Sequence, residues 1–442
     1  MANLNKEQYR ASRADGGVHL VIAGAGTGKT VTLVEKVRSI LALGNVQPER
    51  ILTLTFSRKA AGELKERLLA SGEGEAVSVG TFHSYALSIL RRFANDFLND
   101  AGFNAFPTIM EDEDKDNIIG ELIRERRGEF YGMPDAAVRR SIERENWSQS
   151  EQSKLKASGL FDAFERLKSD LKERKRSLLF MDFEDIITYC NRLLSRRVDI
   201  LQEITDSLEY ILVDEYQDTS DNNFELLKLL TCDGKKNLFV VGDDWQAIYG
   251  FRNARVEYIL NMSQYFQNIT IHKLTCNYRS REEIVSLSNK FIRGNKNRTK
   301  KRLSSSKGRG GLVAHYGVKS QTEELSLLRN ILERDTGEAA VLFRNNWQRE
   351  VLLKKFPDLA ERGNLSLLTM HASKGLEFDS VIIIGVDDAI IPDKNGKIEE
   401  ERRLFYVALS RAKERLYIIS RLNDRGELPL FGKELAVPLK RA

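Results

Sequence analysis

One stretch, Val21 to Thr30, constrains what this chain can fold into more than any other part of the sequence. It reads Val-Ile-Ala-Gly-Ala-Gly-Thr-Gly-Lys-Thr, and apolar residues at helical spacing follow from Val31 to Leu43. This order predicts a buried strand, a glycine-rich turn and a helix, an arrangement whose backbone N–H groups and helix dipole bind the phosphates of a nucleotide. The alternative is a tight turn between two core elements, since Ala23 stands where the strict motif has glycine.

The side chains of this loop predict a nucleoside triphosphate and Mg²⁺ as its ligands. Lys29 would reach the β- and γ-phosphates, and the hydroxyl group of Thr30 would bind the Mg²⁺ ion. The glycines let the backbone approach the phosphates closely. The surrounding backbone would come from Ala25, Gly26, Thr27 and Gly28.

Composition narrows the class of protein. The chain has 442 residues, 41% of them hydrophobic and 30% charged, which is typical of a globular protein of several domains. It has no apolar run of membrane-spanning length and no apolar signal segment at the N-terminus, and its three cysteines lie too far apart for a metal-binding CxxC motif. These features favour a cytoplasmic protein without a membrane partner. The net charge of +5 permits nucleic-acid binding without demonstrating it.

A pair of acids after a second apolar run completes the predicted nucleotide site. Tyr210 to Val213 reads as a buried strand, and Asp214 and Glu215 follow at its carboxyl end. Asp214 would hold Mg²⁺, and Glu215 would polarise an attacking water molecule beside the phosphate loop. A charged turn after a core strand is the alternative, but the presence of Lys29 earlier in the chain favours catalysis.

Other predicted strands also end in polar or aromatic residues. Phe56 ends a strand that begins at Ile51, where it could stack on a base or cap the core. Thr81 and His83 follow a third strand and suit phosphate contacts, although a lone histidine is more often structural.

Two glutamines and two aromatic residues extend this pattern. Gln246 follows the strand that begins at Leu238 and could sense a γ-phosphate, while Tyr249 and Phe251 could face a bound strand of nucleic acid. Gln8 opens a short helical pattern before the phosphate loop, and its amide could bind the adenine edge.

Two segments lack such signals. From about 93 to 206 the pattern is helical and densely charged, which predicts a separate helical insertion with solvated faces. Residues 293–311 carry eight Lys or Arg and no acid. This second segment predicts either a basic loop that contacts phosphates or a solvated, disordered loop.

In the order of its motifs the chain resembles the UvrD/Rep-type helicases of superfamily one. The motif sequences at residues 245–249 and 369–375 most closely resemble those of the helicase IV branch of that family. The signatures cover nearly the whole chain: Gln8, 23–30, 55–61, 80–84, 214–218, 242–252, 277–280, 369–378 and 401–411.

The resemblance implies a role for each residue at a motif position. Tyr278 would stack on adenine, Glu377 would contact the ribose, and Arg279 and Arg411 would act as arginine fingers on the γ-phosphate. The path of the single strand would be lined by Phe56, Thr81, His83, Tyr249, Phe251 and His371.

The chain departs from the family pattern at three places. Val31 stands where many members have an arginine that stacks on adenine, and Phe251 stands where tryptophan is common. Between Arg279 and Thr369, full-length relatives insert a large subdomain, whereas only a short bridge connects residues 343–347 to Leu367 here. We therefore expect this subdomain to be missing.

By this resemblance we expect an α/β fold of two RecA-like P-loop domains, with ATP and Mg²⁺ between them. The first would comprise residues 1–92 and 205–274, interrupted by a helical insertion at 93–204, and the second residues 275–442. The expected function is an ATP-driven translocase and helicase on single-stranded DNA and at junctions with duplex, moving 3′ to 5′. The alternative is a DNA-stimulated ATPase subunit that loads or licenses a nuclease or another protein partner. A small-molecule kinase would leave Tyr278, Arg279 and Arg411 unexplained.

Overall fold

The computed structural model of this chain describes residues 4–70, 76–142, 147, 149–335, 337–394 and 396–440. The chain forms two compact units, one made of Met1–Thr81 with Ile204–Ala442 and the other of Phe82–Glu203. The larger unit contains two six-stranded sheets, and each of the two units is described separately below.

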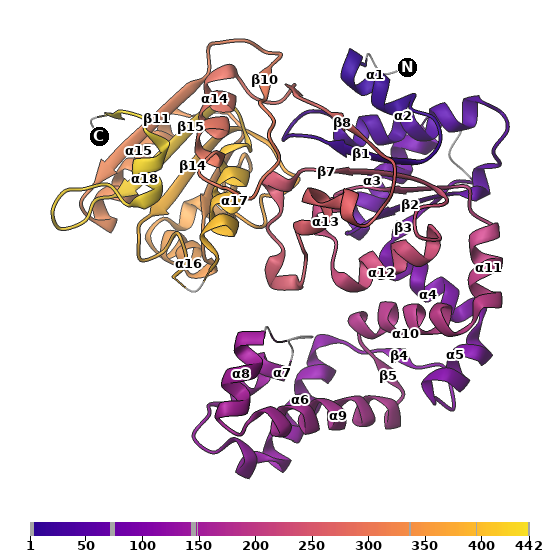
Figure 1. The fold of residues 1–442 in the computed structure, drawn as a ribbon. Helices are drawn as coiled ribbons and strands as arrows, with labels where there is room; N and C mark the ends of the chain where they lie inside the picture. Colours follow the sequence, from indigo (N-terminus) through magenta and orange to yellow (C-terminus); the bar gives the residue numbers. More distant parts are fainter. Residues whose placement is uncertain are drawn as a thin grey trace. The chain divides into compact units, whose positions relative to one another are not determined.

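The first sheet of the larger unit has the strand order β3-β2-β6-β7-β1-β8, and its neighbouring strands pair in parallel (Figure 1). Three of its strands, Val18–Ile22, Ile51–Thr55 and Tyr210–Val213, are largely apolar and buried along their whole length, as expected for a parallel sheet covered on both faces. The strands are β1 (Val18–Ile22), β2 (Ile51–Thr55), β3 (Ser78–Thr81), β6 (Tyr210–Val213), β7 (Asn237–Gly242) and β8 (Ile269–Lys273). The helices of this lobe are α1 (Lys6–Ser12), α2 (Lys29–Ala42), α3 (Arg58–Leu69), α12 (Asp221–Leu230) and α13 (Glu257–Leu260).

The second sheet has the order β13-β12-β14-β15-β11-β16 and is also parallel. Its strands are β11 (Leu312–Val318), β12 (Ala339–Phe343), β13 (Leu365–Thr369), β14 (Phe378–Val386), β15 (Ala412–Arg421) and β16 (Leu439–Lys440). Its helices are α14 (Glu282–Ile292), α15 (Gln321–Arg334), α16 (Asn346–Lys355), α17 (Ile398–Leu409) and α18 (Leu430–Leu435). A short parallel pair, β9 (Cys276–Asn277) with β10 (Ser304–Ser305), precedes this sheet. We call the first sheet with its helices the first lobe, and the second sheet with β9, β10 and its helices the second lobe.

This architecture confirms the predicted fold class of two parallel α/β lobes. The strand order also decides which loops meet. Because β7 lies between β1 and β6, the loops after these three strands lie together at one edge of the sheet. In open parallel sheets this carboxyl edge is where ligands bind. The segments beginning at Ala23, Asp214 and Asp243 therefore belong to one site.

Residues 82–203 form the helical unit, with a core that includes Phe130, Phe164 and Leu167. Its helices are α4 (Phe82–Arg92), α5 (Ala94–Ala101), α6 (Asp112–Glu125), α7 (Asp135–Ile142), α8 (Gln149–Ala157), α9 (Phe161–Ser177) and α10 (Phe183–Arg196), followed by α11 (Val198–Asp206). The unit begins at Phe82, because helix α4 packs on α10, whereas the sequence-based boundaries are 93 and 204. It also contains strands that the sequence did not predict, β4 (Thr108–Ile109) paired with β5 (Phe180–Met181).

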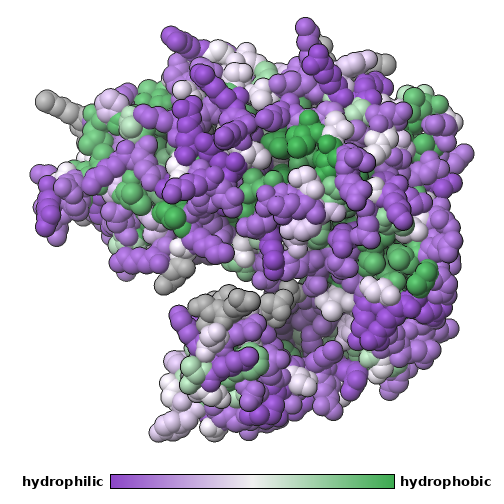
Figure 2. Space-filling model, viewed as in Figure 1, coloured by the Kyte–Doolittle hydropathy of each residue, from purple (hydrophilic) through white to green (hydrophobic). Residues whose placement is uncertain are grey.

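Hydrophilic side chains dominate the face of the chain seen in Figure 2, and hydrophobic side chains form smaller areas between them. Within the described ranges, no helix is both long enough and apolar enough to cross a membrane.

Candidate functional site

The predicted strand, loop and helix are present at the phosphate loop. Strand β1 ends at Ile22 and α2 begins at Lys29, with Gly28 as its N-cap residue. Gly28 has φ 81° and ψ 38°, a left-handed conformation that favours glycine. A Cβ atom there would also lie too close to the Gln8 amide, which would have to move. The loop therefore presents the N-terminus of a fourteen-residue helix to the carboxyl edge of the sheet.

The loop is bonded to the acid pair that follows β6. The Lys29 ammonium donates a hydrogen bond to the Glu215 carboxylate over 2.9 Å, and the Thr30 hydroxyl lies 3.4 Å from Asp214 Oδ2. Glu215 has φ 51°, an unusual value for a residue other than glycine. Backbone strain of this kind is often found at functional sites. The structure thus brings together the four residues predicted to handle the triphosphate and its metal.

The two acids have opposite protonation tendencies. Burial, followed by the adjacent Glu215 carboxylate, raises the pKa of Asp214. Burial also disfavours the charge on Glu215, but the Lys29 and Lys374 ammonium groups outweigh it and lower the pKa of Glu215. Glu215 is therefore a carboxylate at neutral pH, as a base that receives a proton from water must be.

Gln217 is a functional candidate that the sequence reasoning missed. It is fully buried, its Oε1 accepts the backbone N–H of Asp243 over 2.8 Å, and its Nε2 donates to the Glu215 carboxylate. One amide thus fixes the loop after β6 to the loop after β7. The signal available in the sequence was the position of this polar residue between Glu215 and Asp218, at the end of a core strand.

Gln246 joins the first lobe to an arginine of the second. Its Oε1 accepts from Arg411 Nη2 over 2.9 Å, and its Nε2 donates to the Asp243 carboxylate. Arg411 is 1% exposed and also donates to the backbone carbonyls of Val407 and Leu376. Burial and the nearby Arg279 charge lower the pKa of Arg411 to about 9, which leaves it protonated at neutral pH.

Arg279 and Tyr278 lie on the second lobe directly beside the phosphate loop. Arg279 Nε donates to Glu377 over 2.8 Å, and the Tyr278 backbone N–H donates to Gly26 over 2.8 Å. The Tyr278 ring is 41% exposed, and its hydroxyl accepts from Asn5. An exposed ring beside the loop can stack on a base, so the predicted roles of these residues remain stereochemically available.

Gln8 is more constrained than the sequence suggested. Its Nε2 donates to the Thr27 carbonyl over 3.0 Å, and its Oε1 accepts from the Asn5 backbone as part of a helix-capping box. An amide has a second N–H and a second acceptor lone pair, so a base edge would share Gln8 with these structural bonds. Adenine recognition by Gln8 remains a prediction.

Three predicted strand-path residues form one aromatic cluster across the lobes. The ring of Phe251 lies 5.9 Å from that of Tyr249 and 5.5 Å from that of His371, both edge to face. Phe251 is 64% exposed, and the Arg252 guanidinium lies 5.7 Å from its ring centre. Burial, followed by the Arg344 charge, lowers the pKa of His371 to about 4, so its imidazole is neutral at pH 7. An exposed ring beside a cation is suited to stacking on bases next to a phosphate.

The other predicted strand-path residues lie on two separate units. Phe56 follows β2 and is partly exposed, and Thr81 ends β3 in the larger unit. His83 lies in α4 of the helical unit, where its ring packs edge to face on Phe183 at 6.0 Å. Burial lowers the pKa of His83, which fits a neutral, partly structural histidine. Strand contacts by these residues remain predictions.

Lys374 connects the two sets of residues and was not among the predicted site residues. Its ammonium donates to Asp218 over 2.5 Å and to the Gln246 carbonyl over 3.1 Å, and it lies 4.5 Å from the centre of the Tyr249 ring. A lysine of the second lobe therefore contacts the loops after β6 and β7 and, at the same time, an aromatic residue of the predicted strand path. Its place between His371 and Glu377 in one motif was the available signal.

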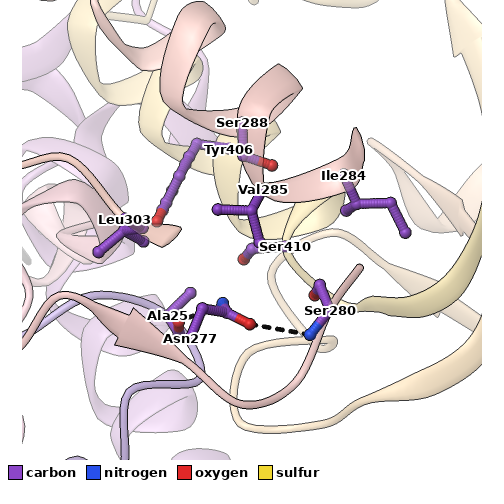
Figure 3. Close-up of a pocket in the computed structure, with 9 residues that line it drawn as sticks. All are labelled: Ala25, Asn277, Ser280, Ile284, Val285, Ser288, Leu303, Tyr406 and Ser410. Carbon is purple, nitrogen blue, oxygen red and sulfur yellow. Dashed lines mark hydrogen bonds between the residues drawn. The ribbon is translucent and has the colours of Figure 1, made fainter. Parts of the chain in front are cut away.

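A small cavity lies behind the phosphate loop, between helices α14 and α17 of the second lobe (Figure 3). Asn277 crosses its floor, where its amide donates to the Ala25 carbonyl and its oxygen accepts from Ser280. The cavity is lined by Ala25, Asn277, Ser280, Ile284, Val285, Ser288, Leu303, Tyr406 and Ser410. Its lining combines polar and apolar side chains of the second lobe with Ala25 of the phosphate loop.

The donor set at Thr30 and Asp214 fits Mg²⁺, which binds hard oxygen ligands and usually combines one or two protein groups with substrate phosphates and water. Nowhere in the described part of the chain do three or more His, Cys, Asp or Glu side chains gather as a self-sufficient metal site. Any Mg²⁺ here would therefore depend on the phosphates for most of its ligands.

These features define a P-loop nucleoside triphosphatase with two lobes around its triphosphate site. Comparison with known proteins gives the family. The UvrD/REP helicase N-terminal domain matches residues 4–267, and the UvrD-like helicase C-terminal domain matches residues 272–360 and 357–423. The chain belongs to the UvrD/Rep family of ATP-dependent DNA helicases.

Curated relatives agree with this assignment. A probable DNA helicase of Mycoplasma pneumoniae is 32% identical over 448 residues, covering 95% of this chain and 84% of the relative. The ATP-dependent DNA helicase PcrA of Staphylococcus epidermidis is 31% identical over 366 residues, covering 80% of this chain and 49% of the relative. PcrA of Leuconostoc citreum is 29% identical over 441 residues, covering 95% and 57%. The chain thus spans about half the length of the PcrA relatives.

Proposed function

We propose that this chain is an ATP-driven translocase that moves 3′ to 5′ along single-stranded DNA and separates strands at junctions with duplex. Lys29 binds the β- and γ-phosphates, and Glu215 takes a proton from the attacking water. Arg279 and Arg411 neutralise charge that develops on the γ-phosphate, as guanidinium groups do in other phosphoryl-transfer sites. Each of these four groups lies in or beside the loops at the carboxyl edge of the first sheet.

The metal belongs to the same proposal. Thr30 and Asp214 would hold Mg²⁺, which supplies charge neutralisation at the β- and γ-phosphates when it is bound. Lys29 has one ammonium for two acceptors, the Glu215 carboxylate and the phosphates. When Lys29 turns to the phosphates, Glu215 loses a partner and is available to accept a proton from water.

A single observation carries the proposal of a motor. In the short segment after β7, Gln246 is hydrogen-bonded to Arg411. A few residues later, the Tyr249 ring contacts the Lys374 ammonium, and the Phe251 ring contacts the His371 ring. Both the ATP-side and the strand-side contacts of this segment are therefore made by the second lobe. A displacement of the lobes during the ATP cycle must therefore change the contacts at the ATP site and at the strand together. Translocation requires such a change.

The experiment measures ATP turnover by the purified chain with single-stranded DNA, with blunt duplex and without DNA. Single strands should stimulate turnover strongly and duplex much less, because only an unpaired strand offers bases to the aromatic cluster. Displacement of streptavidin from biotin at either end of a single strand then measures direction, and faster release from the 5′ end is expected. Equal turnover under all three conditions, or faster release from the 3′ end, would contradict the proposal.

A DNA-stimulated ATPase subunit that serves a nuclease or other protein partner is the second candidate, and one observation favours it. Between β9 and β13 the described residues form only α14, β10, β11, α15, β12, α16 and a short 3₁₀ turn, with no further compact unit. Strand stimulation of ATP turnover together with failure to unwind a duplex with a 3′ overhang would support this candidate. Unwinding by the chain alone would exclude it.

A further inference from the structure

The basic segment 293–311 belongs to the second lobe, and part of it packs against the first lobe. Both sequence-based alternatives, a phosphate-contacting loop and a disordered one, are wrong for Lys301 and Leu303. The Lys301 side chain is 0% exposed and Leu303 is 3% exposed. The segment leaves α14, crosses to the phosphate loop of the first lobe and returns as β10 beside β9. We call residues 299–303, the part that contacts the first lobe, the strap.

Lys301 uses all three of its N–H donors on the first lobe. Its ammonium donates to the Ala23 carbonyl over 2.7 Å, to Asp243 Oδ1 over 2.6 Å and to Asp244 Oδ1 over 2.9 Å. It also lies 4.7 Å from the centre of the Trp245 ring. An ammonium has three donors and no acceptor, so this environment satisfies it completely. Ala23 is the residue that connects β1 to the phosphate loop.

The neighbouring strap residues fix this contact. Thr299 donates its backbone N–H and its hydroxyl to the Asp244 carboxylate, and its carbonyl accepts from the Trp245 indole over 3.2 Å. The Leu303 side chain packs so closely on Gly24 that a Cβ there would collide with it. The strap therefore constrains both the start of the phosphate loop and the loop after β7.

The Asp243 carboxylate connects Lys301 to Gln246, the residue proposed to contact the γ-phosphate. Its Oδ1 accepts from Lys301, and its Oδ2 accepts from the Gln246 amide. The other end of that amide accepts from Arg411. Asp243 is fully buried, so without a cation it would be a buried, uncompensated charge beside Gln246.

We propose that Lys301 is a positioning residue for ATP hydrolysis: through Asp243 it sets the orientation of the Gln246 amide, and through Ala23 it anchors the phosphate loop. This inference rests on the proposed role of Gln246 as the γ-phosphate sensor. In the described part of the chain, Lys301 contacts Ala23, Asp243, Asp244 and the Trp245 ring, none of which is among the residues predicted to contact the triphosphate or the strand. Its loss should therefore act mainly on turnover and little on ligand affinity.

The test compares Lys301→Met with Lys300→Met, the same change at the neighbouring, exposed strap position. Lys301→Met should lower strand-stimulated kcat by about 10- to 100-fold, the effect of a small misplacement of a catalytic group, while KM for ATP changes less than about threefold. Strand binding without nucleotide should be unchanged. Lys300→Met should match the wild type in all three measurements.

A double-mutant cycle tests the route of the effect. With Gln246→Ala already present, Lys301→Met should lower kcat little further, because the group that Lys301 positions is gone. If Gln246→Ala alone leaves kcat unchanged, the proposed role of Gln246 fails. If Gln246→Ala lowers kcat but folded Lys301→Met does not, only the positioning role fails.

A second variant separates positioning from folding. Lys301→Met with Asp244→Asn removes one buried carboxylate together with the ammonium and so preserves the net charge of the cluster. Because it leaves one buried carboxylate unpaired where Lys301→Met alone leaves two, it should unfold at a higher temperature than Lys301→Met yet keep the kcat defect. Wild-type kcat in this folded variant would overturn the proposal, as would failure of both Lys301 variants to fold, which would make the role of Lys301 structural.

Discussion

Replacing Glu215 by glutamine separates two effects of one side chain. The amide cannot accept a proton from water, and a positioned general base contributes about 10²- to 10⁴-fold, or roughly 2.7–5.4 kcal/mol at 1.36 kcal/mol per tenfold. The change also removes the Lys29–Glu215 ion pair, whose side chains are 12% and 28% exposed. Such a partly screened pair is worth about 1 kcal/mol or less, so ATP affinity should be unchanged or rise by at most about fivefold.

The assay measures steady-state ATP turnover with saturating single-stranded DNA, together with equilibrium binding of a fluorescent ATP analogue. Glu209→Gln is the matched control, because Glu209 precedes the same strand at its opposite end and pairs with Arg50 over 3.0 Å. The control should retain wild-type turnover. Turnover by Glu215→Gln within about threefold of the wild type would refute the base assignment, and loss of analogue binding would show that the carboxylate acts in binding.

Three further predictions concern other parts of the chain. Arg279→Ala and Arg411→Ala should each lower strand-stimulated kcat by about 10³-fold or more and leave DNA binding without nucleotide largely intact, as measured by fluorescence anisotropy; weaker DNA binding with normal turnover would place these arginines on the strand path. Phe251→Ala should weaken single-strand binding by about 1–3 kcal/mol without changing the dependence of the binding constant on salt, because stacking releases no counterions; a flatter salt dependence would contradict stacking. In the helical unit, burial opposes ionisation of Asp182, but Lys175 and Lys115 lower its pKa to about 2. Because this folded-state pKa lies below the unfolded value, the stabilisation by Asp182 should be complete above about pH 4 and disappear as pH falls towards 2. The difference in unfolding temperature between wild type and Asp182→Asn should therefore be largest at neutral pH, and a difference that grew on acidification would be the opposite of this result.

The sequence predicted those parts of the site whose residues all lie in one strand and the turn that follows it. The loop before Lys29 and the acids Asp214 and Glu215 each follow a buried apolar run, and parallel pairing brings such strand ends together at one edge. The fold class of two RecA-like lobes was expected from the family resemblance. The roles predicted for Arg279 and Arg411 of the second lobe came from the family resemblance, because the apolar pattern around them predicts no catalytic function by itself.

The parts that were missed depend on pairs far apart in the chain. Lys301 and Asp243 are separated by 58 residues, and Lys374 and Asp218 by 156. Basic residues in a polar segment are usually solvated, so composition favours the wrong environment for Lys301. The start of the helical unit was also missed, because α4 follows β3 without a glycine, proline or charged linker that would mark a boundary. Such features are decided by packing and not by local pattern.

The segment from Asp243 to Phe251 contains residues of both the proposed ATP site and the proposed strand path. Asp243 forms an ion pair with Lys301 of the strap, and Gln246 is hydrogen-bonded to Arg411. Tyr249 contacts Lys374, and Phe251 contacts His371. All of these partners belong to the second lobe, while the segment itself continues directly from β7 of the first lobe. Any displacement between the lobes is therefore applied to both ends of a segment only nine residues long. If Gln246 contacts the γ-phosphate and Phe251 stacks on the strand, as we propose, coupling between hydrolysis and strand binding needs no long pathway, because both residues belong to one short segment whose partners lie in the second lobe.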